Sequence, residues 1–268
     1  MNAGPKPFFL EADPGQRFCL FHEPANGAAR RGCVVYVHPF AEELNKTRRM
    51  AALQARAMCE QGFAVLQIDL HGCGDSSGDF ADARWSGWRQ DLACACSHVL
   101  AHAPRPLILW GLRLGALLAL DYAASASPPD ALLLWQPVLS GDTHLRQFMR
   151  LQSAARLLAA DPDRSSDGEA ATEVGGYVLS RGLRCDIRAI DAHALTPACP
   201  VFWIEQPGPS SDDFPQASAA LIKRWNQAAV RIDSAVSPGP QFWATSEISE
   251  CPSFLAATRN FFLQRFSE

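Results

Sequence analysis

The chain has 268 residues, 48% of them hydrophobic, and a formal net charge of −4. This length and apolar content suit one α/β domain with a large core, and the small negative charge gives no electrostatic footprint for nucleic acid. No apolar run is long enough to cross a bilayer. The nine cysteines show no metal-type clustering, which predicts reduced thiols and no metal site. Residues 1–7 lack a secretion-signal pattern. Together these two observations lead us to expect a cytoplasmic protein.

Strands and helices alternate through the first half of the chain. A hairpin is expected between Phe8 and Phe21, around the turn Pro14-Gly15, before the alternation begins. Short apolar runs bounded by turn residues then predict buried strands, and longer runs with helical periodicity predict helices. The predicted strands are residues 32–37, 63–68 and 106–110, and the predicted helices are residues 48–61, 91–102 and 116–126.

The second half continues this alternation after an insertion. Strands are predicted at residues 131–135, 200–204 and 229–232, and helices at 143–160, 214–227 and 253–266. Residues 161–176 are polar and acidic, which predicts a mobile segment, and residues 177–194 are predicted to form more helix. We therefore expect one domain over residues 1–268 with a mostly parallel sheet of about eight strands, helices on both faces and a small helical cap within residues 140–198.

A glycine-flanked turn carries the most informative pattern. The apolar run Leu107-Ile-Leu-Trp110 stops at Gly111-Leu-Arg-Leu-Gly115 and is followed by the helix-forming Ala116-Leu-Leu-Ala-Leu120. This is the strand, sharp turn and helix layout of a nucleophile elbow, in which glycines relieve crowding around one strained central residue. That residue is normally Ser, Cys or Asp, whereas here it is Arg113, whose guanidinium cannot attack a carbonyl. The pattern predicts an α/β-hydrolase fold without the usual nucleophile.

Of the other two positions of a catalytic triad, the sequence offers candidates for the acid but none for the histidine at its usual place. A serine hydrolase needs an imidazole to accept the hydroxyl proton and a carboxylate to orient the imidazole. Glu205, Asp212 and Asp213 follow the predicted strand that ends at Ile204 and are candidates for the acid. The histidine is expected after the last strand, where the chain reads Ser237-Pro-Gly-Pro-Gln-Phe-Trp243, and no histidine follows His193. Ordinary acyl transfer by a Ser-His-Asp triad is therefore not expected.

Arg113 has two interpretations that can coexist. Its planar fork at the start of a helix suits a carboxylate, a phosphate or a sugar acid. Alternatively the protein neutralises it with Glu42 or Glu43, because a lone buried guanidinium is costly.

Residues 38–49 form the second cluster of interest. In an α/β-hydrolase this loop supplies an oxyanion donor; Pro39 removes one N–H, and Phe40 or Ala41 can still donate. The charged residues there also fit a solvated helix N-terminus. We expect Asp69, His71 and Ser76 to support a turn, and Cys73 to be unreactive. The aromatic residues Trp85, Trp88, Trp110, Trp135 and Phe148 are expected to line the core or the pocket. The candidate catalytic residues are Arg113, Glu43, Glu42 and His38, and the candidate anion-binding residues are Arg113, Phe40, Ala41, Leu114, Asn45 and Lys46.

Four segments carry a family resemblance over about residues 31–262. They read His38-Pro-Phe-Ala-Glu-Glu-Leu-Asn-Lys-Thr-Arg-Arg49, Asp69-Leu-His-Gly-Cys-Gly-Asp-Ser-Ser-Gly-Asp-Phe80, Trp110-Gly-Leu-Arg-Leu-Gly-Ala116 and Trp135-Gln-Pro-Val-Leu-Ser-Gly141. These segments resemble the α/β-hydrolase-superfamily proteins called exosortase A system-associated hydrolase 2. The resemblance implies a hydrolase-type protein, acting on an ester or acyl bond, in the bacterial cytoplasm and encoded with exopolysaccharide and exosortase functions.

Three hypotheses follow, none of which needs a cofactor. The first is a divergent hydrolase or acyltransferase in which Glu42, Glu43 or His38 activates water and Arg113 acts as an electrophilic clamp. The second is a catalytically silent protein that binds an anionic acyl or saccharide ligand. The third is a scaffold that engages another protein of the export or polysaccharide pathway. Neither nucleic acid nor a membrane is an expected partner.

Overall fold

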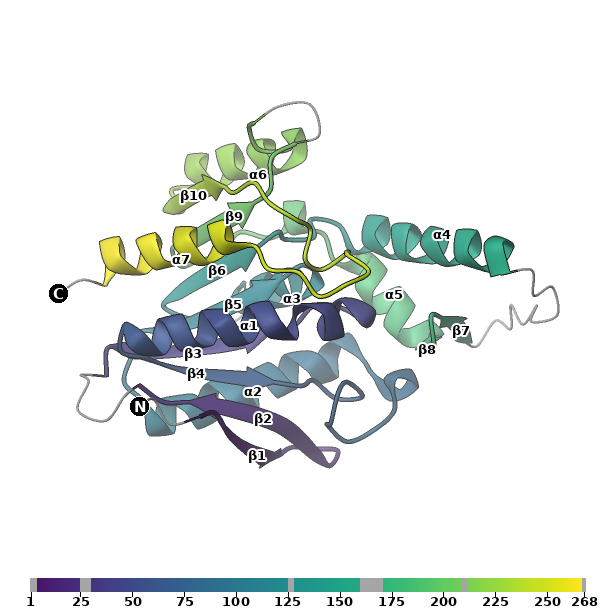
Figure 1. Cartoon of the computed structure of the whole chain (residues 1–268), viewed down its shortest axis with the longest axis horizontal. Coiled ribbons are helices and arrows are strands. Elements are labelled where there is room, and N and C mark those ends of the chain that lie inside the picture. Colours follow the sequence, from purple (N-terminus) through teal and green to yellow (C-terminus); the bar gives the residue numbers. More distant parts are fainter. Residues whose placement is uncertain (1–3, 25–29, 125–127, 160–170, 209–211, 267–268) are drawn as a thin grey trace.

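The computed structural model describes residues 4–24, 30–124, 128–159, 171–208 and 212–266, with only the backbone of residues 151–159. Its centre is an eight-stranded sheet in the order β1-β2-β4-β3-β5-β6-β9-β10 (Figure 1). The hairpin strands β1 and β2 pair antiparallel with each other, β2 pairs antiparallel with β4, and the remaining pairs are parallel. The strands are β1 (Lys6–Glu11), β2 (Gln16–His22), β3 (Gly32–Val37), β4 (Phe63–Ile68), β5 (Leu107–Leu112), β6 (Ala131–Trp135), β9 (Val201–Glu205) and β10 (Ile232–Val236). The expected α/β-hydrolase fold is confirmed.

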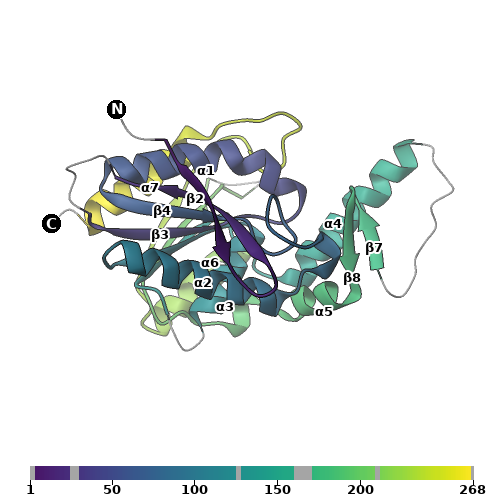
Figure 2. The same cartoon turned by 90° about the horizontal axis from the view of Figure 1, so that it is seen from below.

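Helices cover both faces of this sheet. Every residue of β3 and β5 is buried, as expected for parallel strands covered on both sides. One face carries α1 (Glu42–Glu60) and α7 (Pro252–Arg265), and the other carries α2 (Trp85–His102), α3 (Leu114–Ala123) and α6 (Gln216–Gln227) (Figure 2). None of the helices within the described ranges is long and apolar enough to cross a membrane.

The remaining elements lie together beyond one end of the sheet (Figure 1). They are α4 (Gly141–Ala159), β7 (Ala171–Val174), β8 (Tyr177–Ser180), α5 (Arg181–Ala189) and the 3-10 turn η2 (Ala192–Ala194). We call residues 140–198 the insertion; its role as a cap stays a prediction. A second 3-10 turn, η1 (Phe80–Asp82), precedes α2, and β8 and η1 are in contact.

Several predicted boundaries were wrong. Residues 177–194 were expected to be helical, but residues 177–180 pair with residues 171–174 as a β-hairpin around Gly175 and Gly176, both of which have positive φ. The predicted mobile segment therefore contains a strand and a turn in its last residues, while residues 160–170 lie outside the described residues, as do residues 125 and 126 of another predicted helix. α1 begins at Glu42 rather than Arg48, α2 at Trp85 rather than Asp91, and β10 spans 232–236 rather than 229–232.

The strand register gathers three loops at one edge of the sheet. Val37 pairs with Gly111 and Leu112 pairs with Trp135, so β3, β5 and β6 end side by side. Because parallel strands all point the same way, the loops after them meet at the same edge, which is where open α/β sheets bind ligands. The chain after β3, the Arg113 turn after β5 and the start of α4 after β6 therefore adjoin.

Candidate functional site

The turn between β5 and α3 has the backbone of a nucleophile elbow. Arg113 has φ 56° and ψ −120°, a strained conformation for a residue other than glycine. Its flanking glycines are sterically required: a Cβ on Gly111 would lie 2.4 Å from Cα of Ala116, and one on Gly115 would lie 2.4 Å from the carbonyl oxygens of Val37 and His38. The elbow predicted from the glycine spacing is therefore present, and it fixes the position of the residue at 113.

The Arg113 side chain lies between Glu43 and Trp243. Its Nε donates a 3.2 Å hydrogen bond to Glu43 Oε1, and its Cζ lies 5.5 Å from the centre of the Trp243 ring. A cation over an indole face is attracted by the ring quadrupole. Within the described chain, neither Nη1 nor Nη2 donates a hydrogen bond to another residue, and the side chain is 19% exposed. The two terminal nitrogens are thus available to an acceptor from outside.

Of the two candidate counter-ions, Glu43 takes this role and Glu42 does not. Glu42 Oε2 accepts hydrogen bonds from Asn45 and from the Tyr177 hydroxyl of the insertion, each at 3.3 Å. Burial raises the pKa of Glu43, while the Arg113 and Lys46 charges act in the opposite direction. Glu43 Oε2 is buried without a hydrogen-bond partner among the described residues. The Arg113–Glu43 pair therefore leaves Glu43 Oε2 without a hydrogen-bond donor from the described residues, next to the elbow.

Backbone donors flank the same place. Leu114 is the first residue of α3 and Ala41 directly precedes α1, so neither N–H has an intrahelical acceptor. Ala41 has φ 50°, and Pro39 carries no N–H. Phe40, Ala41 and Leu114, which were expected to form an anion-binding loop, line one common pocket. Asn45 and Lys46 sit on the first turns of α1 and do not line this pocket.

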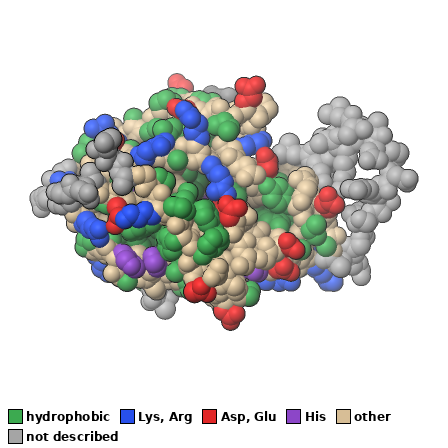
Figure 3. Space-filling model, turned by 60° about the horizontal axis from the view of Figure 1, so that its bottom comes forward, with side chains coloured by type: hydrophobic (Ala, Val, Ile, Leu, Met, Phe, Trp, Pro, Cys, Tyr) green, Lys and Arg blue, Asp and Glu red, His purple; other side chains and the backbone are tan. Residues whose placement is uncertain are grey.

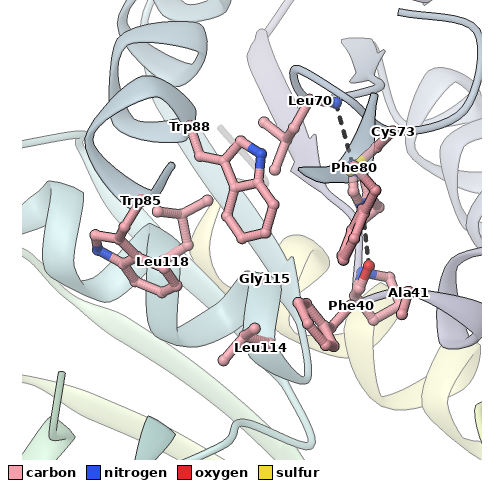
Figure 4. A pocket seen from close by; sticks show the side chains of 12 residues that line it. Phe40, Ala41, Leu70, Cys73, Phe80, Trp85, Trp88, Leu114, Gly115 and Leu118 are labelled. Carbon is pink, nitrogen blue, oxygen red and sulfur yellow. Dashed lines mark hydrogen bonds between the residues drawn. The ribbon is translucent and has the colours of Figure 1, made fainter. Parts of the chain in front are cut away.

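That pocket is narrow and apolar, and the space between its atoms amounts to about 260 Å³ when its open mouth is included. Figure 4 shows the rings of Phe40, Phe80, Trp85 and Trp88 around it, with Leu114 and Gly115 of the elbow at its side. The Phe40 ring also lies 5.2 Å from the Phe148 ring of α4. Apolar walls with a few polar groups at one end are typical of a site for a small molecule.

His144 in the first turns of α4 is a site residue that the sequence reasoning missed. It is 7% exposed, and its ring centre lies 5.8 Å from that of Phe40. Burial and then the nearby Arg113 charge lower its pKa to about 3, so the imidazole is neutral at physiological pH. Its Nε2 is buried with no hydrogen-bond partner among the described residues. No motif marks this residue; its only signal is its place in the helix that follows the strand beside the elbow.

The acid position holds a carboxylate that contacts no imidazole. Glu205 is buried at the end of β9 and accepts hydrogen bonds from Trp203 Nε1 at 2.9 Å and Gln136 Nε2 at 3.3 Å. Burial raises its pKa, and the Ser218 and Trp203 hydrogen bonds reduce that shift. The other acid candidates, Asp212 and Asp213, are exposed in the loop after β9.

The loop after β10 presents Trp243 to Arg113 where a triad would have its histidine. Gln206 Nε2 holds this loop by donating to the carbonyl oxygens of Gly239 at 2.8 Å and Pro240 at 3.0 Å. Trp243 is a second residue that sequence reasoning missed, because nothing in its neighbourhood in the chain connects it with the elbow.

Both ring nitrogens of the candidate base His38 are engaged by backbone groups. Its Nδ1 is 2.8 Å from the Pro39 carbonyl oxygen and its Nε2 accepts from the Leu70 N–H at 3.2 Å. Burial lowers its pKa. Because both ring nitrogens are engaged, the geometry favours a role in holding two loops together over the role of a general base.

Asp69 and Ser76, two of the three residues expected to support the neighbouring turn, do so. Ser76 Oγ donates to the Asp69 carbonyl oxygen at 2.5 Å and accepts from the Phe18 N–H at 2.8 Å, and Asp69 Oδ2 accepts from the Asp75 N–H at 3.1 Å. Cys73 is buried, which raises its thiol pKa and makes the thiolate scarce. No group of His, Cys, Asp and Glu that could hold a metal is found in the described part of the chain.

The strand order, the elbow and the loops gathered around it define the class of protein: this is an α/β-hydrolase fold. Residues 28–165 match the family described as "Serine aminopeptidase, S33", and the chain belongs to that family. The residue at the centre of its elbow is Arg113.

Curated and solved relatives agree with this fold. Protein ABHD12B of Homo sapiens is 29% identical over 152 residues, which are 48% of this chain and 41% of that protein, so the chain spans less than half of that relative's length. Est1E from Butyrivibrio proteoclasticus, solved with ferulic acid, superposes with a TM-score of 0.69 at 16% identity, covering 97% of this chain and 100% of that one. A soluble variant of monoglyceride lipase from Saccharomyces cerevisiae gives 0.68 at 16% identity, covering 100% and 95%. These structural likenesses establish the fold alone.

Proposed function

We propose that this chain binds a small acyl compound with an anionic head and does not hydrolyse it by a serine mechanism. The observation that carries the proposal is the Arg113 guanidinium, which holds the nucleophile position with Nη1 and Nη2 unbonded to other described residues. A guanidinium fork binds a carboxylate through two parallel hydrogen bonds. The Leu114 N–H at the start of α3 adds a further donor for negative charge. The apolar pocket beside the elbow suits the hydrocarbon part of the same ligand.

Serine-type turnover does not fit the residues at the three triad positions. Arg113 supplies no nucleophilic oxygen, Glu205 is held by Trp203 and Gln136, and Trp243 replaces the imidazole. A triad works because one group accepts the proton that another releases. Among the described residues at these three positions, no hydroxyl that could release this proton and no imidazole that could accept it is found.

A divergent hydrolase is the second candidate, and Glu43 is the residue that favours it. Its Oε2 is buried without a partner in the described chain and its pKa is raised, which are properties of a general base for water. Arg113 would then stabilise the oxyanion that forms when water attacks an ester. In this scheme Glu43 Oε2 takes a proton from water, the hydroxide oxygen bonds to the carbonyl carbon, and the alcohol leaves with the proton.

The four motif segments support a proposal about the cellular setting of this protein. Their likeness to exosortase A system-associated hydrolase 2 supports a bacterial cytoplasmic protein that acts beside exopolysaccharide and exosortase functions. A saccharide acid is the alternative ligand in that setting, and a protein of the export or polysaccharide pathway is the expected partner. Co-purification of such a partner that survives Arg113→Ala would favour the scaffold hypothesis over ligand binding.

Calorimetric titration with octanoate and with uncharged octanamide tests the proposal. Octanoate should bind more tightly, and the double variant Arg113→Met with Glu43→Gln should lose about tenfold to a hundredfold in affinity, because hydrogen bonds to charged groups contribute about 1.5–3 kcal/mol. The double variant removes both charges and leaves neither of them buried alone. The matched control, Arg49→Met with Glu250→Gln, removes an exposed pair and should bind octanoate normally.

Two results would redirect the proposal. If octanoate binds the double variant as it binds the wild type, Arg113 is not the anion site. If p-nitrophenyl octanoate is turned over and Glu43→Gln abolishes that turnover, the divergent hydrolase is correct.

A further inference from the structure

A second pocket lies on the far side of His38 from the apolar pocket. It is bounded by β2, β4 and α1, encloses about 610 Å³ including its open mouth, and shares no residue with the elbow. In Figure 3 the face that carries β1 and β2 shows a patch of apolar side chains beside a group of Lys and Arg side chains, with a hollow between them. Nothing in the proposed function uses this pocket.

The inner end of this pocket carries polar groups without partners. Gln67 Nε2 is buried with no hydrogen bond in the described chain, although its Oε1 lies 3.4 Å from His22 Nε2. The Tyr36 hydroxyl is also buried and unbonded; burial raises its pKa, and the nearby Thr47 hydroxyl offsets part of that shift without reaching hydrogen-bonding geometry. An unsatisfied buried polar group costs about 1–3 kcal/mol. Both groups are hydrogen-bond donors, so a ligand oxygen would relieve them.

The mouth of the pocket carries a partly exposed arginine. Arg48 is 42% exposed, and its Nη2 donates to Asp69 Oδ2 at 3.1 Å. That Asp69 oxygen also accepts from the Asp75 N–H at 3.1 Å, so the carboxylate is committed to its own turn. The other Arg48 nitrogens donate to no other residue in the described ranges. The mouth of the pocket therefore offers positively charged hydrogen-bond donors that no other described residue uses.

The walls between the two ends are apolar. Phe18 and Leu20 of β2 face Leu44, Ala51 and Ala52 of α1 across the pocket. Such walls bind a hydrocarbon or aromatic body through its buried area, and the polar groups at the two ends set its direction.

We propose that this second pocket binds a small apolar carboxylic acid that bears a hydroxyl or carbonyl oxygen at its opposite end. The carboxylate lies at the mouth against Arg48, the body lies between Leu20 and Ala52, and the second oxygen accepts from Gln67 Nε2 and the Tyr36 hydroxyl. The site is independent of Arg113, so it stands whether or not the proposed function does.

Calorimetric titration with 4-hydroxyphenylacetate and phenylacetate tests both ends of this ligand. The wild type should bind 4-hydroxyphenylacetate about tenfold more tightly than phenylacetate, because only the former reaches the inner donors. Gln67→Leu should reduce that difference, because only the Tyr36 hydroxyl then remains as an inner donor, and it should still bind phenylacetate. Arg48→Met should weaken both acids about tenfold, and Ala52→Trp, which fills the pocket from the surface of α1, should abolish both.

Under the proposed function the elbow binds small carboxylic acids too, so these titrations are made in the Arg113→Met, Glu43→Gln background, which takes the place of the wild type throughout. The matched control adds Arg49→Met with Glu250→Gln, an exposed pair outside both pockets, and should bind both acids normally. Thermal unfolding of each variant checks folding, and Ala52→Trp keeps the test decisive if Gln67→Leu does not fold. The inference is overturned if neither acid binds the wild type at millimolar concentration, which would leave water as the occupant. It is equally overturned if Arg48→Met and Ala52→Trp bind as the wild type does.

Discussion

Two arginine–carboxylate pairs in this molecule show how a structural pair differs from one that can serve a ligand. Arg17 and Asp91 are each 1% exposed and joined by a 2.6 Å bond; Arg17 Nη1 also donates to the Pro14 carbonyl oxygen at 2.7 Å, and Asp91 Oδ2 accepts from the His71 N–H at 2.8 Å. Arg113 and Glu43 are 19% and 21% exposed, share one 3.2 Å bond, and leave two nitrogens and one oxygen unused among the described residues. Unused donors beside a pocket are what distinguish the second pair.

The largest expected effect comes from breaking the satisfied pair. Asp91→Asn should lower the free energy of unfolding by about 3–5 kcal/mol, because it leaves the buried Arg17 charge uncompensated. Denaturant unfolding followed by circular dichroism measures this change. If the variant is as stable as the wild type, the Arg17–Asp91 pair does not stabilise the fold, and the proposed difference between the two arginine–carboxylate pairs is wrong.

His144 should make stability depend on pH. Its pKa is lowered from 6.5 to about 3 by burial, so between these values the unfolded chain binds a proton that the folded chain does not. The stability that neutral His144 contributes is therefore complete above pH 6.5 and is lost as the pH falls toward 3. Between pH 7 and 5 this loss amounts to about 2 kcal/mol.

The matched variant for this prediction is His144→Leu, which keeps an apolar side chain in the same space. The unfolding free energy of the wild type minus that of the variant should fall by about 2 kcal/mol from pH 7 to pH 5. A difference that stays constant over this range would show that the imidazole is hydrated in the folded protein.

Glu43→Gln should change stability by about 1 kcal/mol or less, far below the effect of Asp91→Asn. The amide oxygen can still accept from Arg113 Nε, and both side chains are about a fifth exposed, so water screens the charge that remains on Arg113. The same unfolding experiment measures both variants. A loss equal to that of Asp91→Asn would mean that Glu43 is as firmly bonded as Asp91, and the distinction between the two pairs would disappear.

The smallest expected effect is on catalysis. Arg113→Ser should restore no measurable hydrolysis of p-nitrophenyl butyrate, because Trp243 and the Pro240 turn supply no base. A fluorophosphonate probe should likewise label no serine of the wild type stoichiometrically. Substantial turnover by Arg113→Ser would reveal a histidine already placed to accept the proton.

Much of the sheet was predictable because its signal is local. Residues 131–135 form a strand with the predicted bounds, since an apolar run between turn residues has few alternatives. The pairing of Arg113 with a carboxylate of residues 38–49 was also predictable, because a partly buried guanidinium needs a counter-ion and only two acids adjoin the elbow in the expected fold.

The rest depends on contacts between distant segments. The strand at residues 177–180 forms by pairing with residues 171–174, a partner that the sequence does not announce. Trp243, in the loop after β10, and His144, in the first turns of α4, reach Arg113 from 130 and 31 residues further along the chain. No local pattern specifies these positions. Strand interiors were therefore read more reliably than the side chains that meet over the elbow.

The position of Arg113 at the start of α3 has a consequence for the buffer in which the protein is studied. The helix dipole places partial positive charge beside a guanidinium that, within the described ranges, pairs with the Glu43 carboxylate alone. Small inorganic anions should therefore collect at this point when no organic acid is present. Melting temperatures in chloride and in sulfate at equal ionic strength should differ more for the wild type than for the Arg113→Met, Glu43→Gln double variant, so salt composition is itself a reporter of whether the elbow is occupied.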